Sequence, residues 1–284
     1  MKVLVTGASG FIGNYVVEEL LRHNYSVIAS SANKDKAAQY GWFDKVRYLA
    51  FDLNEFDEAV NYFEFFEKPD CMIHLAWEGL PNYKSAFHEE INLPRHFALL
   101  GNMIRNGLTD LTVTGTCFEY GMQEGCLTED MPAKPDNPYG SAKDKLRKKL
   151  EEFQQTQPFT FKWARLFYMY GKGQNPKSLL SQLDAALAGG DEVFNMSGGE
   201  QVRDFLPIEE VAANIVKIAL QKNVTGIINC CSGKPIKVKT FVENYLLKQQ
   251  KTITLNLGFY PYPDYEPMEF WGDTTKLEKI ISGV

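Results

Sequence analysis

The stretch Lys2–Gly13, KVLVTGASGFIG, decides the fold. A short apolar run ends in Thr6 and is followed by glycines three residues apart, after which a helical pattern begins at once. In a strand–turn–helix of this kind, the backbone N–H groups and the positive end of the helix dipole face one anion. A side chain on the first two glycines would block a pyrophosphate, and the third glycine lets the helix pack on the strand. The stretch therefore predicts a dinucleotide site that comprises Gly7, Ser9, Gly10, Phe11, Ile12 and Gly13.

The rest of the first half alternates between strand and helix patterns. Runs rich in β-branched residues predict strands at Lys2–Thr6, Ser26–Ala29, Val46–Ala50, Cys71–Leu75, Asp110–Thr114 and Phe161–Leu166. Amphipathic patterns predict helices at Phe11–His23, Asn54–Phe66, Phe87–Asn106 and Tyr139–Gln155. Apolar strands that alternate with helices are typical of a parallel sheet covered on both faces. We expect an α/β fold with a doubly wound parallel sheet of the Rossmann type.

The alternation loosens after residue 166. Glycine-rich loops and a stretch dense in proline and aromatic residues separate short elements, among them predicted helices at Ile208–Leu220 and Phe241–Gln249. We expect a dinucleotide-binding domain over residues 1–166 and a smaller α+β substrate lobe over residues 167–284, with an approximate boundary and segments that can interleave.

Composition excludes several classes of partner. The chain has 284 residues, of which 44% are hydrophobic, and a net charge of −6. This balance argues against a nucleic-acid or anionic-membrane surface. Five cysteines without a Cys-x-x-Cys pair, together with four histidines, suggest neither a zinc site nor disulfides. No leader or membrane-spanning pattern is present, so we expect a cytoplasmic protein that carries no metal.

The residues after the second and third strands bear on the choice of dinucleotide. An acid at the end of the second strand would bind an adenosine ribose with a free 2′-hydroxyl. This chain has Ser30, Ser31 and Lys34 there, and the first carboxylate after the second strand is Asp35. Hydroxyls and an ammonium suit a 2′-phosphate, so NADP(H) is favoured and NAD(H) stays possible. Further cofactor contacts are expected from Asp52 and Leu53, which end the third strand, and from Leu75, Ala76 and Trp77, which end the fourth.

A tyrosine and a lysine stand four residues apart in NPYGSAK, residues 137–143. In a helix this spacing places Tyr139 and Lys143 on one face as neighbours. The spacing alone is common and proves little. An ammonium close to a phenol would favour the ionised form and lower the pKa of the tyrosine.

Taken together, the motifs resemble the extended short-chain dehydrogenase/reductase family, in its nucleotide-sugar epimerase/dehydratase branch. The matching segments occur in family order: Thr6–Gly13, Asp52-Leu53, His74–Ala76, Asn92, Thr114–Gly121, Tyr139-x-x-x-Lys143, Arg165–Gly171 and Arg203–Phe205. The resemblance implies that Tyr139 exchanges a proton with the substrate, that Thr116 hydrogen-bonds the reacting oxygen and that Lys143 holds the nicotinamide ribose. It also implies cofactor contacts from Asn92, Thr114 and Phe167, a nucleotide-sugar substrate and a homodimer formed through residues 87–106 and 139–155.

Departures from the family pattern exclude some of the reactions that members of this branch catalyse. Dehydratases of the branch follow their threonine with Asp-Glu, whereas this chain has Cys117-Phe118. The base cysteine of 3,5-epimerases stands two residues after the Ser/Thr, and Cys117 stands one residue after Thr116. Two reactions remain: reduction of a 4-keto-6-deoxyhexose by NADPH, and C4 epimerisation with bound NAD. A regulator that only senses NADP(H) is a third reading.

Reduction is favoured because the acid typical of NAD sites is missing, the chain is short, and an asparagine common in epimerases is absent from Leu166–Tyr168. The sequence also resembles 4-ketoreductases of this kind, so we predict a dTDP-4-dehydro-6-deoxyhexose 4-reductase. Arg203 is expected on the substrate diphosphate, because a guanidinium forks onto two phosphate oxygens. Asn175 is expected to assist it, and Phe118 is expected to line the sugar pocket.

Overall fold

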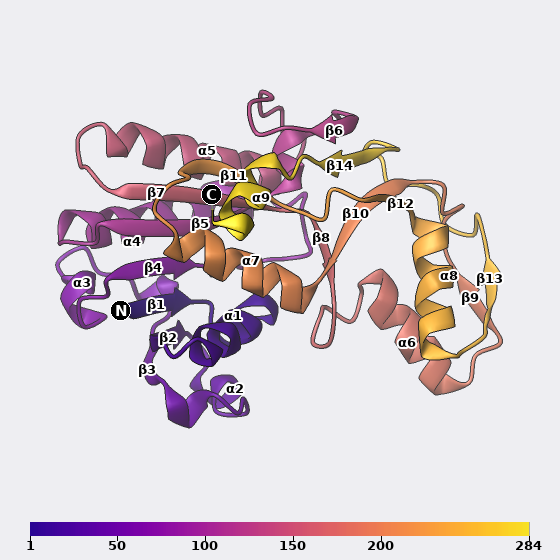
Figure 1. Cartoon of the computed structure of the whole chain (residues 1–284), viewed down its shortest axis with the longest axis horizontal. Helices are drawn as coiled ribbons and strands as arrows, with labels where there is room; N and C mark the ends of the chain where they lie inside the picture. Colours follow the sequence, from indigo (N-terminus) through magenta and orange to yellow (C-terminus); the bar gives the residue numbers. More distant parts are fainter. Residues whose placement is uncertain (284) are drawn as a thin grey trace.

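A computed structural model describes residues 1–283 of the chain, and its main feature is a seven-stranded sheet (Figure 1). The strand order is β11-β7-β5-β4-β1-β2-β3, and every neighbouring pair is parallel. The strands are β1 (Lys2–Thr6), β2 (Ser26–Ser31), β3 (Arg47–Ala50), β4 (Cys71–His74), β5 (Asp110–Thr116), β7 (Thr160–Leu166) and β11 (Gly226–Cys230). The order reverses between β1 and β4, and such a switch point is where ligands bind in open α/β sheets. The predicted doubly wound α/β fold is confirmed.

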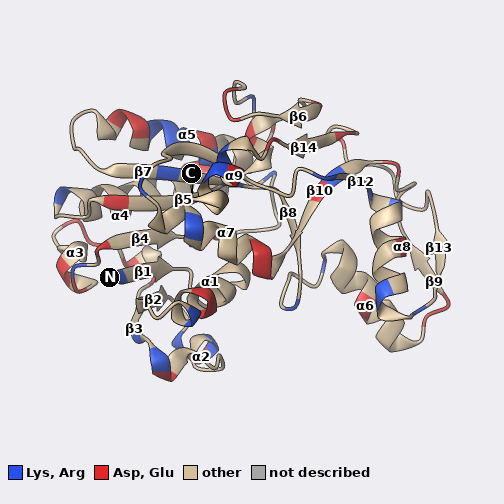
Figure 2. Ribbon diagram, viewed as in Figure 1, with Lys and Arg blue, Asp and Glu red and all other residues tan. Residues whose placement is uncertain are grey.

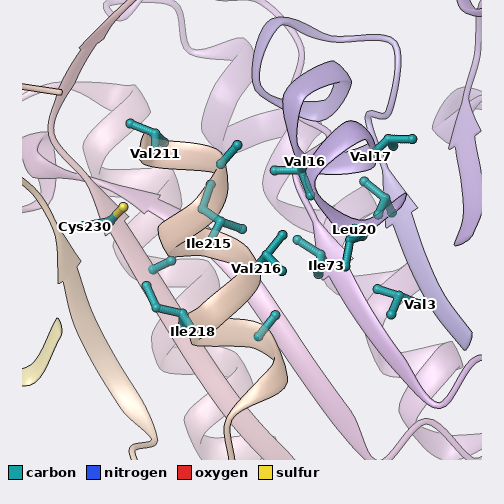
Figure 3. Close-up of a cluster of buried hydrophobic side chains, with 14 of the residues drawn as sticks. Val3, Val16, Val17, Leu20, Ile73, Val211, Ile215, Val216, Ile218 and Cys230 are labelled. Atoms are coloured by element: carbon teal, nitrogen blue, oxygen red, sulfur yellow. The ribbon is translucent and has the colours of Figure 1, made fainter. Parts of the chain in front are cut away.

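Helices cover both faces of this sheet. One face carries α1 (Phe11–Arg22), α7 (Ile208–Leu220) and α9 (Thr275–Ser282), and the other carries α3 (Tyr62–Phe65), α4 (Leu93–Arg105) and α5 (Pro138–Gln154). Valines and leucines of α1 meet isoleucines and valines of α7 over the strands (Figure 3). Burial of this apolar surface on both faces, at about 25 cal/mol per Å², holds the strand ends in place.

The second half of the chain contributes to more than one layer. Strand β11 joins the large sheet and α7 packs on it, whereas β8 (Tyr168–Tyr170), β10 (Val202–Pro207) and β12 (Pro235–Lys237) form a separate sheet. Two further strand pairs join β9 (Val193–Asn195) to β13 (Thr254–Asn256) and β6 (Gly125–Leu127) to β14 (Phe270–Gly272). Helices α6 (Leu179–Gly189) and α8 (Val238–Gln249) pack with β9 around a core of their own (Figure 1). The division of the chain at residue 166 stays a prediction.

Most predicted elements are confirmed within one to three residues, and one is wrong. The helix expected over Asn54–Phe66 is reduced to α3, Tyr62–Phe65. Before it, a 3-10 turn spans Leu53–Glu55, where Asp52 accepts a hydrogen bond from the Asn54 N–H. Asn61 does the same for the Glu64 N–H. Asx side chains that bond nearby backbone N–H groups favour turns and caps over a continuous helix.

The remaining short elements are α2 (Lys34–Ala37) and four η segments: Phe43–Lys45, Leu53–Glu55, His88–Asn92 and Cys117–Tyr120. The third is a π-helical turn that leads into α4, so the predicted helix over residues 87–106 begins irregularly. Acidic and basic residues are interspersed over the ribbon (Figure 2). Over residues 1–283, no helix combines the length and the apolar character that a membrane span requires.

Candidate active site

Two adjoining pockets lie at the switch point, where β1 and β4 end. Both are lined by Gly7, Gly10, Leu75 and Trp77. The first pocket extends toward β5, α5 and β8, and the second extends toward the ends of β2 and β3. A ligand with two ends joined by a diphosphate could therefore occupy both pockets and cross the glycine turn between them.

The glycine turn has no room for side chains. A Cβ on Gly7, whose φ is +71°, would lie 2.7 Å from the Ala76 nitrogen, and a Cβ on Gly13 would lie 2.1 Å from the Gly7 oxygen. The α1 helix begins after Gly10, which supplies no side-chain cap. Uncapped N–H groups at the start of a helix form a ready-made anion site. The cradle therefore fits a dinucleotide diphosphate.

Tyr139 and Lys143 project from the first turns of α5, and both are buried. The helix starts where Asn137 accepts a hydrogen bond from the Gly140 N–H at 2.9 Å. A Cβ on Gly140 would lie 2.6 Å from the Phe118 oxygen, so glycine lets α5 approach the segment after β5 closely. This approach brings Tyr139 to the wall of the first pocket, beside Thr116.

The surroundings of Lys143 differ from the expectation. Its ammonium donates a hydrogen bond to the Thr114 carbonyl at 3.0 Å and lies 3.9 Å from the centre of the Trp77 ring. Burial lowers the pKa of Lys143 to about 7. Burial also raises the pKa of Tyr139, and Tyr83 adds to the rise, while a hydrogen bond with Thr116 opposes it. The predicted lowering of the tyrosine pKa by the lysine is thus wrong, because desolvation of the phenol dominates.

The phenol of Tyr139 is consequently protonated at neutral pH. A protonated phenol can donate a proton to a carbonyl oxygen, whereas removal of a proton from an alcohol requires the phenolate. At neutral pH, Tyr139 is therefore in the protonated form that a proton donor in ketone reduction requires.

Lys143 also makes the stability of the protein depend on pH. Between about pH 7 and its ordinary value of 10.5, the folded chain has released a proton that the unfolded chain still holds, so stability rises with pH through this window. We expect Lys143→Met to raise the melting temperature at pH 6 by about 2 °C or more. The gain should shrink as the pH approaches 10, which thermal unfolding without added dinucleotide would measure. An equal loss of stability at every pH would contradict this reading of Lys143.

The second pocket collects most of the predicted adenosine contacts. Its lining includes Ser9, Ser30, Ser31, Leu53 and Ala76. Lys34, the first residue of α2, does not line it, whereas Lys36, two residues further along the helix, does. Among residues 1–283, the only carboxylate in the lining is Glu78, which follows β4 rather than β2.

The first pocket is largely apolar and aromatic. The predicted residues Phe11, Ile12, Thr116, Phe118, Phe167 and Asn175 line it. Tyr83 also lines it, and the centre of its ring lies 4.8 Å from that of Phe118 and 5.6 Å from that of Tyr139. Tyr168 also lines the first pocket and was not predicted from the sequence. The segment around it contains two tyrosines, and no local pattern indicates which of them lines the pocket.

Besides Lys34, five predicted residues are absent from the lining of both pockets: Asp52, Asn92, Thr114, Lys143 and Arg203. Asp52 caps the turn at Leu53–Glu55, Asn92 donates a hydrogen bond to the Glu78 carbonyl at 2.9 Å, and Thr114 accepts the one from Lys143. Arg203 is 2% exposed, and its guanidinium pairs with Glu266 at 2.9 Å. Diphosphate binding by Arg203 stays a prediction that requires this carboxylate to give way.

Comparison with known proteins shows the family to which the chain belongs. The model of the NAD dependent epimerase/dehydratase family matches residues 3–231. The chain is 30% identical over 273 residues to the dTDP-6-deoxy-L-talose 4-dehydrogenase (NAD(+)) of Aggregatibacter actinomycetemcomitans, covering 96% of this chain and 99% of that protein. The chain therefore belongs to the NAD-dependent epimerase/dehydratase family, and the resemblance drawn from its motifs is confirmed.

Two further proteins illustrate the breadth of the likeness. The GDP-6-deoxy-D-talose 4-dehydrogenase of the same organism is 26% identical over 289 residues, which cover 99% of this chain and 91% of that protein. The structure of UDP-glucuronic acid 4-epimerase from Bacillus cereus, in complex with UDP-glucuronic acid and NAD, has a TM-score of 0.84 at 22% identity. It covers 99% of this chain and 93% of that one, and it shows that the fold is shared.

Proposed function

We propose that the protein is an NADPH-dependent reductase of the C4 ketone of a nucleotide-linked 4-dehydro-6-deoxyhexose, with dTDP as the nucleotide. The observation that carries the proposal is the buried, protonated Tyr139, which meets Thr116 at the wall of an apolar pocket that adjoins a glycine cradle. The relatives named as 4-dehydrogenases of dTDP- and GDP-linked 6-deoxytaloses support chemistry at C4 of a deoxysugar.

Tyr139, Thr116 and Lys143 each have a separate role in the proposed reaction. The glycine turn would hold the dinucleotide by its diphosphate, and the bound dinucleotide would supply the hydride for C4. Tyr139 donates its hydroxyl proton to the ketone oxygen, and Thr116 hydrogen-bonds that oxygen, so that the product is an alcohol. The family resemblance assigns Lys143 to the nicotinamide ribose and to the return of the proton to Tyr139, although its ammonium bonds the Thr114 carbonyl here and it lines neither pocket. Burial of all three side chains excludes water that would compete for the proton.

The lining of the first pocket supports a deoxysugar. Phe118, Phe167 and Tyr83 present ring surfaces, and Leu166 adds an aliphatic one. A methyl group at C6 gains by contact with such surfaces, whereas a hydroxyl there would lose its hydrogen bonds to water. Asn175 and Gln174, in the loop between β8 and α6, supply polar groups to the same pocket.

A second candidate is NAD-dependent C4 epimerisation. It is favoured by the 26% identity over 317 residues to the UDP-arabinose 4-epimerase 1 of Arabidopsis thaliana, of which the match covers 74%. An epimerase should retain NAD through purification and interconvert UDP-hexoses without added cofactor. A sensor of NADP(H) would need no acid, so the placement of Tyr139 beside Thr116 argues against that third reading.

The decisive assay follows NADPH absorbance. We expect a decay when dTDP-4-dehydro-6-deoxyglucose is added to the purified protein. No decay with this or any other 4-keto nucleotide sugar would reject the proposal. Light scattering of the same sample should give the mass of a homodimer, which we propose from the family likeness.

The choice of dinucleotide is a separate prediction. Ser30, Ser31 and Lys36 give hydroxyls and one ammonium to the second pocket, which suit a 2′-phosphate, although the name of the 30% identical relative specifies NAD(+). We expect kcat/KM to be higher with NADPH than with NADH, and Ser31→Asp to reverse the order by placing a carboxylate at the end of β2. Ser282→Asp, at an exposed serine of α9, is the control and should keep the wild-type preference. An unchanged preference in Ser31→Asp would contradict the assignment.

A further inference from the structure

The imidazole of His96, on α4, forms part of the wall of the second pocket. Its ring is 1% exposed, and its Nδ1 pairs with His74 Nε2 at 2.8 Å. His74 in turn pairs through Nδ1 with the Thr6 hydroxyl at 2.8 Å. Within residues 1–283, His96 Nε2 is a buried polar atom without a hydrogen-bond partner. Buried polar atoms of this kind in native proteins are expected to have a partner, often a ligand or a water molecule.

The orientation of this ring is fixed on two sides. His74 holds one nitrogen, and the Trp77 indole stacks on the ring with centres 4.6 Å apart and planes 15° apart. Trp77 is itself anchored, because its Nε1 donates a hydrogen bond to His88 Nδ1 at 3.1 Å. Burial lowers the pKa of His96 well below its ordinary value, and it lowers the pKa of His74 to about 3. Both rings are therefore neutral, and His96 offers a single directed hydrogen-bonding atom rather than a charge.

The arrangement of the two pockets indicates which part of a dinucleotide would lie nearest His96. The nicotinamide end must lie near Tyr139 and Thr116, which line the first pocket. The diphosphate must cross Gly7 and Gly10, which the pockets share. The adenosine end then falls in the second pocket, together with the ends of β2 and β3 and His96.

We propose that His96 Nε2 hydrogen-bonds the adenosine moiety of the dinucleotide, and that Thr6 and His74 position the ring for this contact. The proposal rests on the dinucleotide binding that the proposed function requires. A neutral imidazole nitrogen either donates or accepts, depending on the tautomers of the His74–His96 pair. The ribose hydroxyls and the amino edge of adenine offer matching partners for either case.

Binding of dinucleotide fragments tests the proposal without turnover. We expect His96→Leu to weaken ADP-ribose binding about 10-fold in calorimetry, which is the effect of one lost hydrogen bond. His96→Gln, which keeps a donor and an acceptor, should recover part of this loss. Nicotinamide mononucleotide, which lacks the adenosine, should bind all variants alike. The matched control is His23→Leu. His23 is exposed and directly follows α1, so this variant should bind ADP-ribose as the wild type does.

Nitrogen-15 NMR of the histidines in the wild-type protein gives an independent readout that does not depend on any variant. ADP-ribose should shift the Nε2 resonance of His96, and dTDP should leave it in place. The proposal would be overturned if His96→Leu bound ADP-ribose with unchanged affinity, or if ADP-ribose did not shift the Nε2 resonance. The partner of Nε2 would then be a water molecule. Failure of the proposed function would look different: ADP-ribose would bind through His96, and NADPH would not be oxidised by any keto sugar.

Discussion

Tyr139→Phe should lower kcat for ketone reduction by about 10²-fold or more, because proton transfer by a positioned side chain contributes a factor of that order. The substitution removes one hydroxyl and keeps the ring, which packs against Tyr83 and Trp77. The fold and the dinucleotide site should therefore persist. Stopped-flow measurement of NADPH oxidation at saturating keto sugar gives the rate of this step.

Two controls make the result for Tyr139 specific. The dissociation constant of the variant for the dinucleotide should stay within about threefold of the wild type, and its melting temperature should change by no more than the loss of one hydrogen bond implies. A rate near that of the wild type would show that another group donates the proton. A lost rate together with lost binding would instead indicate a disturbed pocket.

Gly13→Val should abolish dinucleotide binding, with a loss of about 100-fold or more, because α1 could no longer pack on the glycine turn. A Cβ at residue 13 would already lie 2.1 Å from the Gly7 oxygen and 2.8 Å from the Ala8 Cα. These neighbours are backbone atoms, so they can move only if the turn itself changes. Such overpacking costs several kcal/mol and shifts the N–H groups that face the diphosphate.

Gly41→Val is the matched control for Gly13. Gly41 is exposed, and a Cβ there would meet nothing within 4 Å. Calorimetry with NADPH should show wild-type affinity for this variant. If Gly13→Val bound NADPH as tightly as Gly41→Val does, the glycine turn would not be the diphosphate site.

The sequence predicted the sheet well because its physical signals are local. Buried parallel strands are short apolar runs, and the glycine turn needs residues without side chains at fixed spacing. The helix expected over residues 54–66 failed for a local reason as well, since Asp52 and Asn61 bond the backbone N–H groups that would continue it. The pairing of Tyr139 with Thr116 was predicted from the order of the motifs and the family resemblance rather than from residue spacing.

The features that the sequence did not predict depend on tertiary contacts. Lys143 was expected to lower the pKa of Tyr139, but its ammonium contacts Trp77 and the Thr114 carbonyl, and burial decides both pKa values. The partner of Arg203 is Glu266, 63 residues away, and no local pattern joins them. His96 reads from sequence as one polar residue on the buried face of a helix, and only the fold brings it to His74 and the pocket.

Transfer of deuterium from NADPH to the sugar tests the central claim most directly. The purified protein would be mixed with NADPH deuterated at C4 of the nicotinamide and with dTDP-4-dehydro-6-deoxyglucose, and the product sugar would be examined by NMR. We predict one deuterium at C4 of the product, formed at the rate at which NADPH is consumed and lost in Tyr139→Phe. A sugar that carries no deuterium at C4, or interconversion of C4 epimers with no NADPH consumed, would contradict the account.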